Sequence, residues 1–266
     1  VVLISQSGET ADTLAALLLA KERHAHTLAI VNVPGSSIAR EADDVLYTWA
    51  GPEIAVASTK AYLVQLAALY LLGIKLGVLH GVLTAEQEAA LCRDLKEAPA
   101  QIRQALRMEP EVEACAQALK DAQHVFFIGR GTDYALSMES SLKLKEVSYI
   151  HCEAYAAGEL KHGTISLIED GTPVIAVATR PQLLPKTVSN LEEVRSRGAK
   201  VLLVCREGDE VPEDLAGQIL RVPAARPVFA PLSAIVPLQL LAYHIAVLRG
   251  CDVDKPRNLA KSVTVE

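Results

Sequence analysis

The alternation of short aliphatic strands with helices, which occurs twice along the chain, is the feature that most limits its fold. In the first half, strands are expected at 1–5, 28–32 and 45–49, and helices at 10–23 and 56–76. In the second half, strands are expected at 174–178, 201–205 and 219–222, and helices at 187–198 and 232–249. Aliphatic strands separated by helices are typical of parallel sheets covered on both faces. The sequence therefore predicts a duplicated α/β unit.

The two halves differ in one respect. The second half carries an additional strand at 125–128, a turn at 129–131 and a helix at 135–149, all ahead of its first matched strand. The first half has no counterpart of these elements, and the chain begins with Val1 rather than Met. We therefore expect a first unit at 1–82 that lacks its opening strand and helix, with residues ahead of Val1 cut away or unseen. A second unit is expected at 83–250, led by a helical connection, and a tail at 251–266.

Composition excludes several classes of protein. Half of the residues are hydrophobic but only 4% are aromatic, so the core is expected to consist of Leu, Val, Ile and Ala. The net charge of −6 gives no basic surface for nucleic acid. Five cysteines without a Cys-x-x-Cys motif indicate reduced packing residues of a cytoplasmic protein. The apolar stretch 63–76 is expected to be a buried helix rather than a membrane span.

The turn between the first strand and the first helix is rich in hydrogen-bond donors. Ser5-Gln6-Ser7-Gly8-Glu9-Thr10 supplies three hydroxyl groups, a carboxamide and a glycine. Backbone N–H groups at the start of a helix attract anions, and a glycine lets the backbone approach a ligand closely. Ser and Thr also favour helix starts for capping alone. The turn is therefore either a phosphate-binding site or an ordinary capped turn.

A second candidate site lies on the helix expected at 135–149. At 100° per residue, Glu139, Lys143 and Glu146 fall on one stripe, between apolar neighbours. The opposite face, which we expect to be the solvent face, carries Ser137, Ser141, Lys145 and Ser148. The charged stripe would then lie near the core, where burial shifts pKa values into a range useful for catalysis. The alternative is a ladder of surface ion pairs.

Two further segments are polar, and neither indicates a metal. The loop 153–163 ends in Lys161-His162-Gly163, where His162 is either a proton-transfer group or an ordinary surface histidine. The tail at 252–266 has the composition of a frayed terminus. No pair of His and carboxylate residues has the spacing of metal ligands. Residues 129–134 begin like the Gly-x-Gly-x-x-Gly fingerprint of dinucleotide-binding proteins, but Tyr134 stands in place of its third glycine. We therefore expect neither a metal nor a cofactor.

Four separated segments together resemble one enzyme family. They are Ser5–Thr10, Val56-Ala57-Ser58-Thr59-Lys60, the loop 158–163 and the tail 257–266. These segments are similar to the isomerase half of the glucosamine-6-phosphate synthases, and the resemblance spans essentially the whole chain. It implies two flavodoxin-like sugar isomerase (SIS) domains, with parallel sheets flanked by helices.

The resemblance also implies a reaction and a set of site residues. Fructose 6-phosphate and ammonia would give glucosamine 6-phosphate by amination and ketose-to-aldose isomerisation. The substrate would be bound by Ser5, Gln6, Ser7 and Thr10 at its phosphate, and by Val56 and Ser58 at the sugar. The catalytic residues would be Glu146 as the base between C1 and C2, Lys143 and Lys261 beside the developing charge, and His162 for ring opening. His162 would come from the neighbouring subunit of a homodimer, and the tail would be a lid.

The family further implies that ammonia comes from a glutaminase domain, which this chain does not contain. Two other functions are compatible with the same residues. A SIS sensor of sugar phosphates would keep the phosphate site but would not need Glu146, Lys143 or His162. A plain phosphosugar isomerase or deaminase would keep these catalytic residues but would not need the Lys261 tail.

Overall fold

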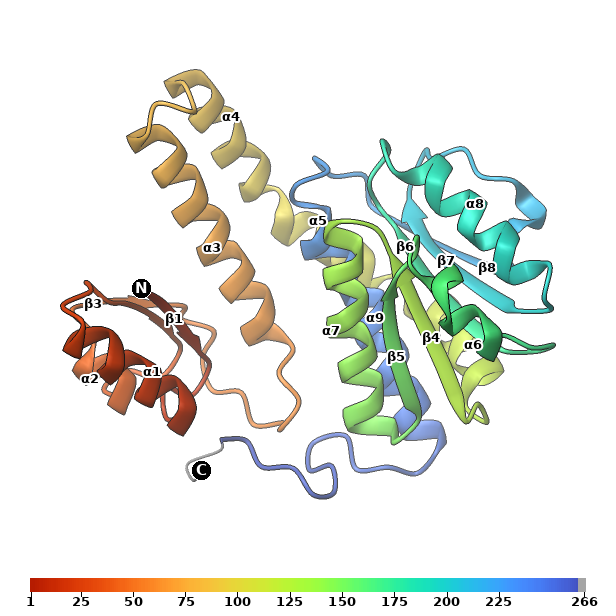
Figure 1. Ribbon diagram of the computed structural model, residues 1–266, viewed down its shortest axis with the longest axis horizontal. Coiled ribbons are helices and arrows are strands. Elements are labelled where there is room, and N and C mark those ends of the chain that lie inside the picture. Colours follow the sequence, from red (N-terminus) through yellow and green to blue (C-terminus); the bar gives the residue numbers. More distant parts are fainter. Residues whose placement is uncertain (263–266) are drawn as a thin grey trace. The chain divides into compact units, whose positions relative to one another are not determined.

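The structure is a computed structural model that describes residues 1–262, apart from the side chain of Glu213 (Figure 1). The last four residues of the predicted lid, Val263–Glu266, lie outside the described residues. The chain forms two compact units, one of Val1–Cys92 with the tail from Asp254, and one of Arg93–Val253. The tail that was expected as a separate segment thus lies with the first unit.

The first unit is built on a parallel three-stranded sheet with the order β1-β2-β3. Its elements are β1 (Val2–Ser5), α1 (Ala11–Glu22), β2 (Leu28–Val31), α2 (Ser37–Glu41), β3 (Asp44–Tyr47), α3 (Lys60–Leu79) and the start of α4 (Ala85–Lys96). The strands are short and aliphatic, and β2 in the centre is the most buried of the three. Leu17 of α1 and Ile38 of α2 pack against Leu3, Ala29 and Val31 of the sheet. This packing fixes the carboxyl end of β1, where the candidate phosphate turn begins.

Helix α3 differs from its expected environment. The helix is apolar around its whole circumference, and only Ala61, Ala68 and Ile74 of its residues are buried. Lys60–Leu79 and Ala230–Leu248 are both long and apolar enough to cross a membrane by length and composition, with 11% and 67% of the apolar window buried. The prediction of a helix over 63–76 is confirmed, but the prediction that it is buried is wrong for the residues described. Amphipathic patterning is weak in this helix, so no single face directs it into a core.

The second unit contains a parallel five-stranded sheet with the order β5-β4-β6-β7-β8. Its helices are the end of α4, α5 (Ala98–Leu106), α6 (Glu109–Leu119), α7 (Thr132–Ser148), α8 (Leu184–Arg195) and α9 (Ala230–Leu248), with short 3-10 turns η1 (Leu160–His162), η2 (Thr164–Leu167) and η3 (Glu213–Leu215). Its strands are β4 (His124–Gly129), β5 (His151–Ala156), β6 (Pro173–Ala178), β7 (Lys200–Arg206) and β8 (Gln218–Val222). Counted within the unit this order is 2-1-3-4-5, the flavodoxin-like arrangement.

The sheet of the second unit is buried on both faces. Helices α7 and α9 pack against each other on one face, and α8 packs on β6 and β7 from the other (Figure 1). The strand interiors are Val, Ile, Leu and Ala, in agreement with the composition. The order β1-β2-β3 repeats the order β6-β7-β8, so the predicted duplication is confirmed. Among residues 1–262, the first unit holds no counterpart of β4, α7 and β5.

Two elements were not expected from the sequence. Residues 153–156 were interpreted as the start of a polar loop, but they belong to the edge strand β5, which pairs with β4. Its residues from Glu153 onward are only partly buried, and the strand therefore lacks an aliphatic signature. The loop at Pro34–Ser37 also leads into the short helix α2.

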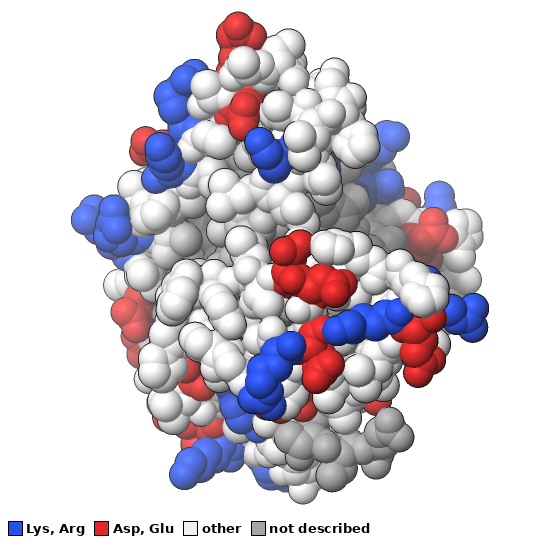
Figure 2. Space-filling model, turned by 90° about the vertical axis from the view of Figure 1, so that its left-hand side faces the viewer, with Lys and Arg blue, Asp and Glu red and all other residues white. Residues whose placement is uncertain are grey.

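The surface in Figure 2 shows acidic and basic side chains interspersed between uncharged areas.

Candidate active site

The turn after β1 presents hydroxyl groups at an open helix start. Ser5 Oγ accepts a hydrogen bond from the Gly8 N–H at 3.0 Å and lies 3.1 Å from Thr10 Oγ1. Thr10 is the N-cap residue of α1, but its side chain makes no capping bond, so it leaves the first N–H groups of the helix open. Ser7 Oγ accepts from the Glu9 N–H at 3.2 Å. The geometry is that of an anion site, with hydroxyl donors at the positive end of a helix.

The one carboxylate of this turn is directed away from the open helix start. Glu9 Oε1 accepts a hydrogen bond from the Ser37 N–H at 2.8 Å. Hydrogen bonds from Ser37 hold the pKa of Glu9 below its usual value, so the carboxylate stays charged and engaged with α2. Because Glu9 binds the start of the neighbouring helix, its negative charge is directed away from the donors of the candidate phosphate turn.

Gly8 is required by the close approach of the next loop. The residue has φ +69°, and a Cβ atom on it would lie 2.0 Å from Ser36 Oγ. Ser36 is 3% exposed, and its hydroxyl has no hydrogen-bond partner among the residues that the structure describes. The loop is also attached through the Ile38 N–H, which donates to the Gly8 carbonyl at 3.0 Å. The shape of the phosphate turn therefore depends on Gly8 and on the loop before α2 together.

The predicted sugar-binding segment and the tail meet within the first unit. Lys261 Nζ lies 2.9 Å from Glu53 Oε2 and donates to Ser58 Oγ at 3.4 Å. The Val56 N–H donates to the Asp254 carbonyl at 2.9 Å. Three predicted site residues from opposite ends of the chain are thus brought together. The tail is held against the segment before α3, so it is not a frayed terminus as far as Ser262.

The charged stripe of α7 is a compact ion-pair cluster. Lys143 Nζ lies 2.6 Å from Glu146 Oε2 and 3.6 Å from Glu139 Oε1. The side chains of Glu139, Lys143 and Glu146 are 15%, 8% and 21% exposed. Burial raises the pKa of Glu139 to about 7, against the opposing attraction of Lys143. Two carboxylates that share one buried lysine are suited to proton transfer near neutral pH.

The stripe is largely buried, but the reasoning that placed it there was wrong. The serine face, expected in solvent, is packed inside, with Ser137, Ser141 and Ser148 each less than 5% exposed. The Ser137 and Ser148 hydroxyl groups donate to the carbonyl groups four residues earlier, which satisfies them without water. The exposed residues of α7 include Met138, Leu142 and Lys145. Helix α7 is therefore buried on more of its circumference than its sequence indicates.

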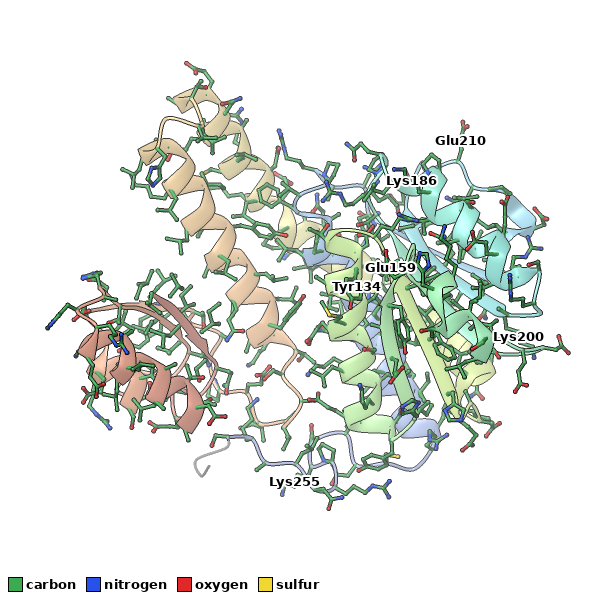
Figure 3. The ribbon with its side chains drawn as sticks, in the orientation of Figure 1. Tyr134, Glu159, Lys186, Lys200, Glu210 and Lys255 are labelled. Atoms are coloured by element: carbon green, nitrogen blue, oxygen red, sulfur yellow. The ribbon has the colours of Figure 1, made fainter. Side chains whose placement is uncertain are left out.

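His162, on η1, lies near the opposite end of the second sheet from Glu146, which is close to the end of α7. Helix α7 begins after the carboxyl end of β4 and runs back toward the amino ends of the strands. Glu146 lies 14 residues along it, about 21 Å from its start at 1.5 Å per residue. His162 is exposed on η1, shortly after Glu159, which is labelled in Figure 3. The chain ahead of η1 is attached to the carboxyl end of β4, because the Ala157 N–H donates to the Gly129 carbonyl at 2.8 Å. One copy of the second unit therefore does not bring these two predicted catalytic residues together.

The corresponding end of the second sheet has no open turn. Thr179, directly after β6, donates through its N–H and Oγ1 to the Asp133 carboxylate at 2.9 and 2.6 Å. Asp133 is 1% exposed, and burial raises its pKa although these bonds favour the charged form. An internal carboxylate thus takes up the donors that the first unit presents to a ligand.

Among the described residues, no group of three or more His, Cys, Asp or Glu side chains is placed to hold a metal.

Comparison with known proteins identifies the family. The model of the SIS domain matches residues 1–75 and 118–249, which is most of the chain. The chain belongs to the SIS-domain family. The C-terminal domain of glucosamine-fructose-6-phosphate aminotransferase from Francisella tularensis has a similar structure, with a TM-score of 0.92 and 43% identity over 96% of this chain and 73% of that chain. The predicted SIS fold, with two parallel sheets flanked by helices, is confirmed.

Longer SIS-domain relatives carry a similar name. The glutamine–fructose-6-phosphate aminotransferase (isomerizing) of Symbiobacterium thermophilum is 57% identical over 265 residues. That alignment covers the whole of this chain and 44% of the relative, so the chain spans less than half the length of this protein. A glucosamine-6-phosphate deaminase from Thermotoga maritima is 26% identical over 98% of this chain and 74% of that chain, with a TM-score of 0.76.

Sequence reasoning missed one buried charge in this SIS-domain site. Glu53 was not a candidate, yet its side chain is 4% exposed and holds Lys261. Its partner is 208 positions away, so neither spacing nor helical periodicity could reveal the pair. A carboxylate a few residues ahead of the apolar helix α3 was the only available signal, and it is also typical of an ordinary helix start.

Proposed function

We propose that this chain is the isomerase part of a glucosamine-6-phosphate synthase. It would convert fructose 6-phosphate and ammonia into glucosamine 6-phosphate and water. The similarity to the aminotransferase C-terminal domain supports the reaction, and the geometry of the first unit supports the substrate class. The proposal rests on one observation: the same chain holds an open, hydroxyl-rich turn at Ser5–Thr10 in its first unit and a buried Glu-Lys-Glu cluster on α7 in its second unit.

The phosphate turn supplies binding and orientation. Ser5, Gln6, Ser7 and Thr10 bind the 6-phosphate with hydroxyl groups, an amide and the N–H groups at the start of α1. The turn holds no cation, so affinity comes from oriented donors and the positive end of the helix. Val56 and Ser58, with Lys261 beside them, form the pocket for the sugar carbons.

The α7 cluster supplies the proton transfer. Ammonia adds at the C2 carbonyl of the open-chain ketose and water is lost, which leaves an imine. The Glu146 carboxylate removes a proton from C1 while the imine nitrogen gains one, which gives an enolamine. The carboxylate then returns its proton to C2 while the C1 hydroxyl loses one, which leaves an aldose with an amine at C2. Lys143, 2.6 Å from Glu146, and Lys261 stabilise the negative charge that develops between these steps. His162 assists opening of the sugar ring.

The complete site is proposed to need a second copy of the chain. Because His162 lies at the other end of α7 from Glu146, we assign it to the site of the neighbouring subunit in a homodimer. Ammonia would come from a glutaminase domain. We also propose a cytoplasmic location, two domains at 1–82 and 83–250 with a lid at 251–266, and neither nucleic-acid nor membrane partners.

The experiment that tests this function replaces the proposed base. Full-length protein is incubated with fructose 6-phosphate and ammonia, and glucosamine 6-phosphate is measured by mass spectrometry. Loss of a general base typically costs about 100- to 10,000-fold in rate, so E146Q is expected to lose turnover to that extent. The control is E192Q, because Glu192 is an exposed carboxylate on α8. Unchanged turnover in E146Q would exclude Glu146 as the base.

The similarity to a glucosamine-6-phosphate deaminase favours a second candidate, a deaminase or plain phosphosugar isomerase. Such an enzyme would interconvert sugar phosphates without depending on the lysine of the tail. A K261A variant separates the two, since the synthase is expected to lose amination while a plain isomerase keeps its turnover. A SIS sensor would bind fructose 6-phosphate in calorimetry and release no product in either variant or in the wild type.

A further inference from the structure

We propose that Glu53 is a positioning residue, which holds the Lys261 ammonium group at the sugar pocket and thereby holds the tail over it. Its effect on catalysis rests on the proposed function, whereas its hold on Lys261 can be measured without activity.

The two oxygen atoms of Glu53 serve different parts of the first unit. Oε1 accepts hydrogen bonds from the Thr59 N–H at 2.9 Å and the Ala61 N–H at 3.3 Å, at the start of α3. Oε2 lies 2.9 Å from Lys261 Nζ in the tail. One carboxylate therefore joins the helix that follows the sugar-binding segment to the lysine that is expected to act on the sugar.

The carboxylate is charged at neutral pH, although its side chain is only 4% exposed. Burial by itself raises the pKa of Glu53, but the bonds from Thr59, Lys261 and Ala61 outweigh it and hold that pKa below its usual value. A fixed, buried negative charge attracts an ammonium group more strongly than an exposed carboxylate does, because less water screens it. Glu53 thus gives Lys261 one preferred position.

Glu53 is a charged partner of Lys261, and Ser58 is a neutral one. The ammonium group reaches Ser58 Oγ at 3.4 Å, which is longer than its 2.9 Å contact with Glu53. Seven residues earlier, the tail is also attached to this segment by the bond from the Val56 N–H to the Asp254 carbonyl. Loss of the Glu53 charge therefore releases the Lys261 ammonium group, while the tail stays attached at Asp254.

The first test measures the reactivity of Lys261 without any substrate. Trace acetylation of full-length protein is followed by mass spectrometry, with exposed Lys75 of α3 as the internal reference. In E53Q, Lys261 is expected to react about tenfold faster relative to Lys75, since a strong charged hydrogen bond no longer holds it. E53D keeps the charge and is expected to restore most of the protection. An unchanged ratio in E53Q overturns the proposal.

A matched control separates tail release from general destabilisation. Asp209 is also a largely buried, paired carboxylate, with its side chain 7% exposed and 2.7 Å from Arg206, in the second unit. D209N is expected to leave the acetylation ratio of Lys261 unchanged. Release of Lys261 in D209N as well as in E53Q would mean that loosening of the fold is responsible, and it would overturn the assignment to Glu53.

The second test measures turnover and substrate binding together. E53Q is expected to lower kcat about 100-fold, the loss typical of a misplaced catalytic group, with KM changed much less because the phosphate turn is intact. E53D is expected to recover part of kcat. If E53Q frees Lys261 but keeps wild-type kcat, the positioning role is overturned. If the wild type forms no amino sugar, the proposed function fails, and the acetylation ratio alone decides whether Glu53 holds Lys261.

Discussion

At the scale of single residues, the phosphate turn depends most on Gly8. The G8A substitution adds a Cβ atom 2.0 Å from Ser36 Oγ and places a side chain at φ +69°, where alanine is strained. The Ser36 loop or the turn must move, which misplaces Ser7 and Thr10. We expect G8A to weaken binding of fructose 6-phosphate by about tenfold or more, or at least 1.4 kcal/mol, as measured by calorimetry.

Gly81 offers a matched control for this substitution. It also has a positive φ, +67°, but an added Cβ would meet no atom within 4 Å. G81A therefore introduces the backbone strain without the collision, outside the loop before α2, and should bind fructose 6-phosphate with nearly wild-type affinity. Equal weakening in G8A and G81A would mean that a general effect of backbone strain, rather than the contact with Ser36, weakens binding.

The contrast between Gly8 and Glu53 shows which residues of the site a sequence can reveal. Ser5–Thr10 is contiguous, and its donors directly follow a strand and precede a helix, so a candidate phosphate turn can be identified from local order. Glu53 acts through Lys261, 208 positions away. Such a pair exists only once the fold has formed, and the surrounding residues carry no sign of it.

At the scale of secondary-structure elements, the strands with aliphatic interiors were predictable and the polar edge strand was not. The strands β6 and β7 are buried on both faces and have aliphatic interiors. Edge strand β5 carries polar and partly exposed residues, so it was taken for a loop. On α7, serine side chains look like a solvent face, but their bonds to the preceding turn let them be buried. A polar side chain therefore does not predict a solvent-facing position when a carbonyl group of its own helix accepts its hydrogen bond.

The burial of Glu139 on α7 makes the stability of the second unit depend on pH. Its pKa is raised from 4.5 to about 7, so the folded state keeps a proton that the unfolded chain releases. Stability from this group is therefore fully present below pH 4.5 and is lost as the pH rises toward 7. The loss amounts to at most about 3 kcal/mol, at 1.36 kcal/mol per pKa unit.

The E139Q substitution tests this pH dependence. Glutamine cannot ionise, so the decrease in stability between pH 5 and pH 7.5 is expected to be smaller in E139Q than in the wild type, by up to about 3 kcal/mol. The measurement is urea unfolding at several pH values. E192Q, which alters an exposed carboxylate on α8, should retain the wild-type profile. Parallel profiles for E139Q and wild type would show that Glu139 ionises at its ordinary pKa in the folded protein.

At the scale of the whole molecule, the duplication has produced two units with different roles. The first keeps an open turn after β1, whereas in the second Asp133 closes the corresponding end of β6 with its own carboxylate. The second unit instead contributes the charged cluster of α7. The repetition of the fold could be predicted from the strand pattern. The difference between the two turns could not, because it depends on whether the hydroxyl and N–H donors after the strand find an acceptor such as Asp133 within the folded chain.

The separation of His162 from Glu146 along α7 leads to a prediction about the assembly. If each site combines Glu146 of one subunit with His162 of the other, E146Q and H162A proteins should be almost inactive alone. In a mixed dimer one site receives both substitutions, and the other retains both native residues. Random reassociation of equal amounts places half of the subunits in mixed dimers, so activity should recover to about a quarter of the wild-type value. The measurement is glucosamine 6-phosphate formation after the two proteins are dissociated and reassociated together. If both residues came from one subunit, every site would carry a substitution, and mixing would restore nothing.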